Sequence, residues 1–160
     1  MHFSGNKYIL DKHYGYIKRF YGDKKANRSG VLLINHIDEG LEILSELGAC
    51  ILTKSAYCVH PIFQNDKDLE KNYETSKHLH PFVVLLTMEY RKTANAYLCR
   101  PVTDHYQISD LPKINLEEVR LMLIADKTQN QRDFLGYHKN HERYNELDKY
   151  FKLWLEHLRR

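Results

Sequence analysis

Apolar side chains recur along most of this chain at the spacing of an α-helix. In residues 14–21 they follow an i, i+3, i+6, i+7 stripe, and residues 37–47 carry apolar side chains on one face with acidic side chains elsewhere. Gly48 follows the second stripe directly, where a helix commonly ends. Residues 23–30 are basic and rich in Gly, Asn and Ser, which predicts a loop between these two helices.

The middle of the chain predicts three further segments. Thr53 is a candidate cap for a short helix that ends at Val59, because Pro61 stops or bends a helix soon after. Residues 64–80 are polar and predict a loop and a short helix. Residues 82–98 begin with an apolar run that a strand also tolerates, but the later apolar positions keep helical spacing, so a helix is favoured.

The last third predicts a linker over residues 102–112 and two more helices. Asn115 followed by two glutamates is typical of a helix start, and a final amphipathic helix begins near Glu142 and ends on basic residues. We therefore expect an all-α fold of about six or more helices, with residues 1–160 forming a single domain.

Composition narrows the class of protein. The chain has 160 residues, 42% of them hydrophobic and 28% charged, which is globular and neither disordered nor membrane-spanning. The net charge of +3 is too small to indicate a nucleic-acid partner. The first residues lack the order of a signal peptide, and the three cysteines show no CxxC spacing, so we expect small core cysteines and a cytoplasmic protein without membrane contact.

Four polar residues stand at positions where chemistry is plausible. His36 follows an apolar run at the start of a helix, His60 ends the third predicted helix, and Asp126 is flanked by apolar residues, so its carboxylate is expected to be partly buried. Asn130 shares a helix face with Asp126, one turn later. Imidazole and carboxylate groups are common ligands of divalent metal ions.

A buried carboxylate is costly unless a cation or several donors compensate it. Lys127 is adjacent to Asp126 and is expected to point away from it on a helix. A metal ion, a histidine, or an arginine from elsewhere in the fold is then needed. The simpler alternative is a structural ion pair, for example with Arg28 or Arg132.

Three segments resemble the HD-domain superfamily, and within it the hydrolase domain of Rel/Spo-type alarmone enzymes, including the small single-domain hydrolases. Residues 28–36 (RSGVLLINH) resemble the family's entry into its first histidine. Residues 44–48 (LSELG) and 56–60 (AYCVH) resemble the approach to the second histidine. Residues 123–133 (LIADKTQNQRD) resemble the pattern LADKxxNxRD, which is the most specific of the three.

The resemblance implies an all-α HD-type domain with a metal ion held by His36, His60 and Asp126. One divalent ion is implied, either Mn, Zn, Co or Fe, and loss of the ion is the alternative that the altered motif leaves open. The motif's fourth ligand, an aspartate, is replaced here by Pro61. A Glu-Asp pair that the alarmone hydrolases use to activate water is replaced by the neutral isosteres Gln64 and Asn65, which remain candidate catalytic residues only as groups that orient water.

The same resemblance suggests which residues bind substrate. Arg28 corresponds to a base-stacking arginine, and the neighbouring Lys24 and Lys25 are candidates to meet phosphates. Lys127 and Asn130 correspond to pocket residues that contact a nucleotide. From the sequence itself, Arg91 and Asn95 lie one turn apart on the middle helix and are further candidates to line the pocket.

Two functions remain open. The first is a divergent metal-dependent phosphohydrolase that acts on a nucleotide or another phosphorylated small molecule. The alternative is a catalytically inactive HD-like module that binds a nucleotide or a protein partner, because three acidic positions of the motif have become neutral. An iron-dependent oxidative enzyme is less favoured, since the dinuclear relatives need more ligands than this chain shows.

Overall fold

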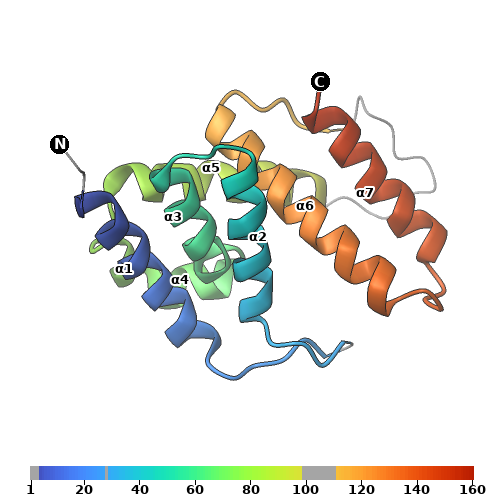
Figure 1. The fold of residues 1–160 in the computed structure, drawn as a ribbon, viewed down its shortest axis with the longest axis horizontal. Helices are drawn as coiled ribbons and strands as arrows, with labels where there is room; N and C mark the ends of the chain where they lie inside the picture. Colours follow the sequence, from blue (N-terminus) through green and yellow to red (C-terminus); the bar gives the residue numbers. More distant parts are fainter. Residues whose placement is uncertain (1–3, 28, 99–110) are drawn as a thin grey trace.

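The computed structural model describes residues 4–27, 29–98 and 111–160 (Figure 1). In these ranges the chain is all-helical, as predicted, and an isolated β-bridge between Lys25 and Leu32 is its only extended pairing. The elements are α1 (Ser4–Tyr21), α2 (Ile34–Glu46), α3 (Ile51–Val59), the 3-10 helix η1 (His60–Phe63), α4 (Asp66–Ser76), α5 (Pro81–Leu98), α6 (Glu117–Tyr137) and α7 (Tyr144–Leu158).

The helix ends follow local chemistry, with two corrections. Gly48 follows α2 with a φ of 70°, a conformation that L side chains rarely adopt. The expected cap Thr53 lies inside α3 and is buried, and Cys50 holds the N-cap position instead. Leu116, rather than Asn115, is the N-cap residue of α6.

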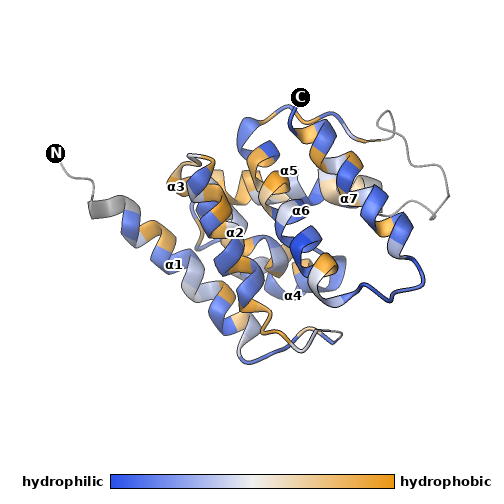
Figure 2. Ribbon diagram, turned by 45° about the vertical axis from the view of Figure 1, so that its right-hand side comes forward, coloured by the Kyte–Doolittle hydropathy of each residue, from blue (hydrophilic) through white to orange (hydrophobic). Residues whose placement is uncertain are grey.

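Two helices, α3 and α6, form the centre of the packing. Helix α3 contacts α1, α2, α5 and α6, and α6 also contacts α2, α5 and α7. Polar and apolar bands alternate along the peripheral helices α1 and α7 (Figure 2), as expected for helices with one buried face. The buried polar residues discussed below lie where these central helices meet.

Two other predictions concern the cysteines and the linker. Cys58 is buried as expected, whereas Cys50 is exposed, and Cys99 lies outside the described residues. Most of the predicted linker over residues 102–112 also lies outside them. Among the described helices, none combines the length and the apolar character needed to cross a membrane.

His13 on α1 is a buried histidine remote in sequence from the predicted site. His13 is 2% exposed, and its Nδ1 lies 2.6 Å from the carbonyl oxygen of Ile9. Burial lowers the pKa of His13 below its ordinary value; the Ile9 carbonyl opposes this shift, while Lys12 and His80 add to it. His13 is therefore neutral in the folded protein near neutral pH.

This burial predicts how stability depends on pH. An unfolded chain binds a proton at His13 near its ordinary pKa of about 6.5, above the folded value, so the free energy of unfolding falls as the pH decreases below about 6.5. Replacing His13 by leucine is expected to flatten this slope in urea unfolding curves recorded over that range. An unchanged slope in His13→Leu would contradict the assignment.

Candidate metal centre

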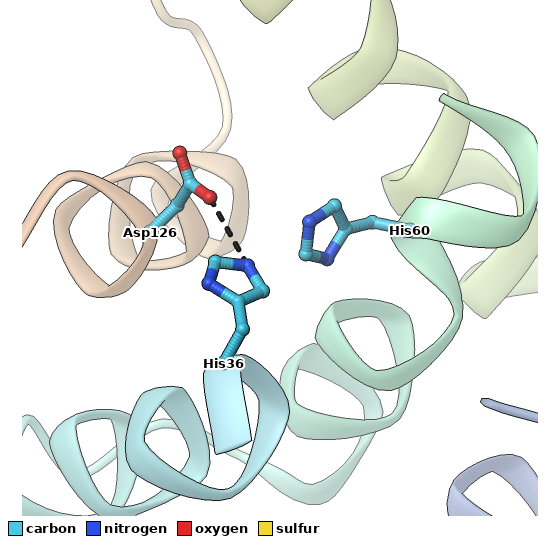
Figure 3. Close-up of side chains that lie close together, drawn as sticks. All are labelled: His36, His60 and Asp126. Atoms are coloured by element: carbon cyan, nitrogen blue, oxygen red, sulfur yellow. Dashed lines mark ion pairs between the residues drawn. The ribbon is translucent and has the colours of Figure 1, made fainter. Parts of the chain in front are cut away.

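Three side chains from distant parts of the chain meet in one cluster. His36 comes from the first turn of α2, His60 from the junction of α3 and η1, and Asp126 from the middle of α6 (Figure 3). One ligand atom from each lies within 4.8 Å of those from the other two. The structure thus brings together the three residues that the sequence proposed as metal ligands.

The orientation of His36 is set by a chain of hydrogen bonds. Its Nδ1 lies 2.5 Å from Oε1 of Gln129, whose Nε2 donates to Oε2 of Glu39 at 3.3 Å. Because a carboxylate only accepts, Glu39 turns the amide oxygen of Gln129 toward His36. Nδ1 of His36 therefore carries a proton, and Nε2 faces the cluster.

His60 is oriented by the backbone. Its Nδ1 lies 2.6 Å from the carbonyl oxygen of Tyr57, which can only accept, so Nδ1 is the protonated nitrogen. Burial, together with the nearby His36, lowers the pKa of His60 to about 4. His60 is therefore neutral at pH 7, and its Nε2 carries a free lone pair. Hydrogen bonds of this kind also select the liganding nitrogen in metal sites.

The imidazole of His36 and the carboxylate of Asp126 lie close together, and both can share a proton or a metal ion placed between them. Nε2 of His36 lies 3.3 Å from Oδ1 of Asp126. Burial would lower the pKa of His36, but the Asp126 carboxylate raises it above its ordinary value. Burial would likewise raise the pKa of Asp126, but Lys127 and His36 hold it well below its usual range. A proton on Nε2 satisfies this pair, and a metal ion can take the place of that proton.

The expectation that Lys127 points away from Asp126 is wrong. Its ammonium Nζ lies 2.9 Å from Oδ2 of Asp126, and both side chains are about 95% buried. A long lysine side chain can bend back along its own helix when aromatic side chains of α7 close off the outward direction. Asp126 is thus compensated by His36, since a histidine was one of the expected partners, and by Lys127, which was not expected.

A pocket of about 820 Å³ adjoins the cluster. Helices α1, α6 and α7 contribute an apolar wall that includes Phe20, Tyr21, Phe134, Tyr150 and Phe151. Its polar lining includes His60, Gln64, Asp126, Lys127 and Asn130. An apolar body with a few convergent polar groups is typical of a small-molecule site.

Only part of the predicted catalytic and substrate set reaches this pocket. Asn130 and Gln64 line it, and Nε2 of Gln64 donates to Oδ1 of Asn95 at 2.6 Å. Asn65 does not line the pocket: its Oδ1 accepts from the backbone N–H of Asp68 at 2.8 Å as the cap of α4. The polar side chain at position 65 therefore satisfies a helix end instead of orienting water.

The remaining predicted contacts fall elsewhere. Arg91 does not line the pocket and is paired with Asp66 on α4. Lys25 is exposed and is absent from the lining, which includes its neighbour Lys24. Arg28 lies outside the described residues.

Sequence reasoning missed the residues that support the cluster. Gln129, Tyr57 and Tyr90 are all buried, and the ring centroids of Tyr57 and Tyr90 lie 4.9 and 4.7 Å from that of His60. Gln129 follows Asp126 by three positions, so a shared helix face was a signal that could have identified it. The two tyrosines read as ordinary core positions because nothing in their spacing distinguishes them.

The donor atoms suit a divalent transition metal. Two imidazole nitrogens and one carboxylate oxygen are a donor set of the kind that could hold Mn, Fe, Co or Zn and leave further positions open. Comparison with known proteins adds no assignment: no family model, no curated protein and no solved structure matches this chain.

Proposed function

We propose that this protein is a divergent HD-type, metal-dependent phosphohydrolase that acts on a nucleotide or another phosphorylated small molecule. The observation that carries the proposal is the cluster of His36, His60 and Asp126 beside a pocket of about 820 Å³. Both imidazoles are held with Nδ1 protonated, which leaves Nε2 as the nitrogen available to a metal ion. The resemblance to HD motifs supports the same assignment.

The chain's own residues would divide the work as follows. His36, His60 and Asp126 would hold the ion, which when bound would polarise a phosphoryl oxygen and acidify a water molecule. Asn130 would hydrogen-bond the substrate, and the apolar wall would receive its uncharged part. Gln64 would accept a hydrogen bond from water, because an amide has no useful basicity near pH 7.

A general base must come from another residue in this scheme. Asp68 and Asp133 also line the pocket and are the candidate carboxylates. Asp68 is held by Asn65, whose Nδ2 donates to its Oδ2 at 2.6 Å. Asn65 would then act through Asp68 and through the start of α4, in place of the direct role expected from the motif.

The neutral residues at positions 64 and 65 favour a second candidate, an inactive module that binds a nucleotide or a protein partner. Nε2 of Gln64 is engaged by Asn95, and Asn65 caps α4. Neither can replace a catalytic carboxylate. This candidate retains the pocket but predicts no turnover with any metal.

Metal analysis tests the proposed site, and a turnover assay with a nucleotide panel then separates the two proposals. Plasma mass spectrometry of untagged protein is expected to find about one equivalent of a transition metal, because three ligands suffice for a site. His36→Ala and Asp126→Ala should lose it, while the exposed-histidine control His78→Ala should keep it. Circular dichroism would check that each variant folds, with Asp126→Asn as a milder replacement.

Each outcome assigns the protein differently. Metal binding with release of phosphate from a nucleotide panel supports the hydrolase. Metal binding with nucleotide binding but no turnover supports the inactive module. No metal after incubation with Mn, Co, Zn or Fe would overturn the hydrolase proposal.

A further inference from the structure

Lys127 is a buried cation that lines the pocket, and its ammonium group contacts a candidate ligand. The residue is 4% exposed, and its Nζ lies 2.9 Å from Oδ2 of Asp126. The other oxygen, Oδ1, is the one that faces His36 at 3.3 Å. The two oxygens of this carboxylate therefore have different partners, Lys127 at Oδ2 and His36 of the cluster at Oδ1.

Two aromatic side chains of α7 hold the ammonium in place. Nζ of Lys127 lies 5.7 Å from the ring centroid of Tyr150 and 5.5 Å from that of Trp154, within the range of cation–π interaction. Trp154 is fully buried and Tyr150 is 8% exposed. An ammonium enclosed in this way has little freedom to turn toward a ligand in the pocket.

We propose that Lys127 is a positioning residue that occupies Oδ2 of Asp126, leaves only Oδ1 for a metal ion, and thereby weakens divalent-metal binding by the cluster. The inference rests on the metal site proposed above. It differs from the substrate-binding role that the resemblance suggested for Lys127, because it requires an effect on the metal with no substrate present.

The charges explain the direction of the effect. Asp126 is the only anion among the three candidate ligands, and Lys127 cancels its charge within the described cluster. A buried ammonium also repels a divalent ion bound a few ångströms away, where low polarity leaves the interaction poorly screened. Removing the ammonium while keeping the carboxylate should therefore strengthen metal binding.

The test measures Co²⁺ binding by the full chain, by calorimetry and by the visible spectrum of the bound ion, at about pH 8 without substrate. Lys127→Met is expected to tighten binding by about 10- to 100-fold, the size of effect seen when groups behind a metal ligand are changed. Lys127→Gln, which keeps a hydrogen-bond donor but no charge, should tighten it less. Lys127→Arg, which keeps the charge, should remain near wild type.

A matched control removes the same charge elsewhere. Lys152 on α7 is exposed and paired with Asp148, so Lys152→Met should leave Co²⁺ binding unchanged. Tyr150→Leu should change the affinity for Co²⁺ in the wild-type background. It should have no further effect on that affinity in Lys127→Met, because the ring influences the metal only by holding the ammonium in place. An additive effect of Tyr150→Leu would mean that the ring acts independently.

Thermal unfolding supplies a second readout. Metal-free Lys127→Met should melt below the wild type, since a buried carboxylate has lost its cation, and Co²⁺ should raise its melting temperature by more than it raises that of the wild type.

The outcomes distinguish this inference from the proposed function. If the wild type binds Co²⁺ and Lys127→Met binds it equally or more weakly, the inference is overturned while the metal site stands. If only Lys127→Met binds, Lys127 is confirmed as the residue that opposes the metal. If neither binds, both the inference and the proposed metal site fail.

Discussion

Replacing Gly40 by alanine is expected to lower the free energy of unfolding by about 1–3 kcal/mol, the usual cost of overfilling a packed core. A methyl group on Gly40 would collide with the phenol ring of Tyr57. Tyr57 is fully buried, so its ring cannot swing into solvent. Urea unfolding followed by circular dichroism measures the change.

The same substitution should also disturb the cluster. The hydroxyl of Tyr57 lies 3.4 Å from Nε2 of His36, and the carbonyl of Tyr57 accepts from His60. A displaced Tyr57 would therefore shift both imidazoles. We expect Gly40→Ala to weaken Co²⁺ binding as well as stability.

Gly136 provides a matched control on α6. A methyl group there meets no atom within 4 Å, so Gly136→Ala should stabilise the helix by about 0.5–1 kcal/mol. In a Tyr57→Leu background, Gly40→Ala should cost less, because the smaller side chain leaves room. Equal stability of Gly40→Ala and the wild type would contradict the close packing of α2 on α3.

Adding an acidic side chain at position 61 is expected to strengthen metal binding at the proposed site by about 10-fold or more, since an added anionic ligand raises the charge of the donor set. Pro61 follows His60 directly, lines the same pocket and stands where HD motifs carry an aspartate. Pro61→Asp therefore places a carboxylate beside an existing ligand. Calorimetric titration with Mn²⁺ or Co²⁺ measures the gain.

The structure separates the contributions of the neighbouring replacements. Gln64→Glu adds a carboxylate to the pocket lining and is the change expected to raise hydrolysis alongside Pro61→Asp. Asn65→Asp should add little, because position 65 caps α4, and an aspartate caps as well as an asparagine. Pro112→Asp, outside this pocket, introduces the same charge as a control. Equal metal affinity in Pro61→Asp and Pro112→Asp would contradict the placement of the missing ligand.

Local pattern was sufficient for much of the fold. The apolar stripes on α2 and α7 identify these helices within a few residues, because burial of one face at a 3.6-residue period is a property of the segment itself. Helix α6 is different, since it is buried continuously from Met122 to Lys127. The three proposed ligands were found in the same way, from His36 and His60 at helix ends and from Asp126 within an apolar run. The prediction that these three residues lie close together came from the family resemblance, because their spacing in the sequence does not indicate it.

The direction of long side chains could not be predicted from spacing. Adjacent helix positions point about 100° apart, which made Lys127 and Asp126 appear separate. Four rotatable bonds allow the lysine to return to the carboxylate once Tyr150 and Trp154 enclose it. Arg91 likewise reaches Asp66 instead of the pocket.

The sequence by itself determined the helices, the all-α class and the residues able to bind a metal ion, because each is a property of a short segment. Only the tertiary structure decided which nitrogen of His36 and His60 faces the cluster, since Gln129 and the Tyr57 carbonyl set this across the packing. It also decided that Lys127 faces Asp126. The hydrogen-bond partners of a buried side chain and the groups that surround it depend on the folded core, because residues that are distant in the chain come together there and exclude water.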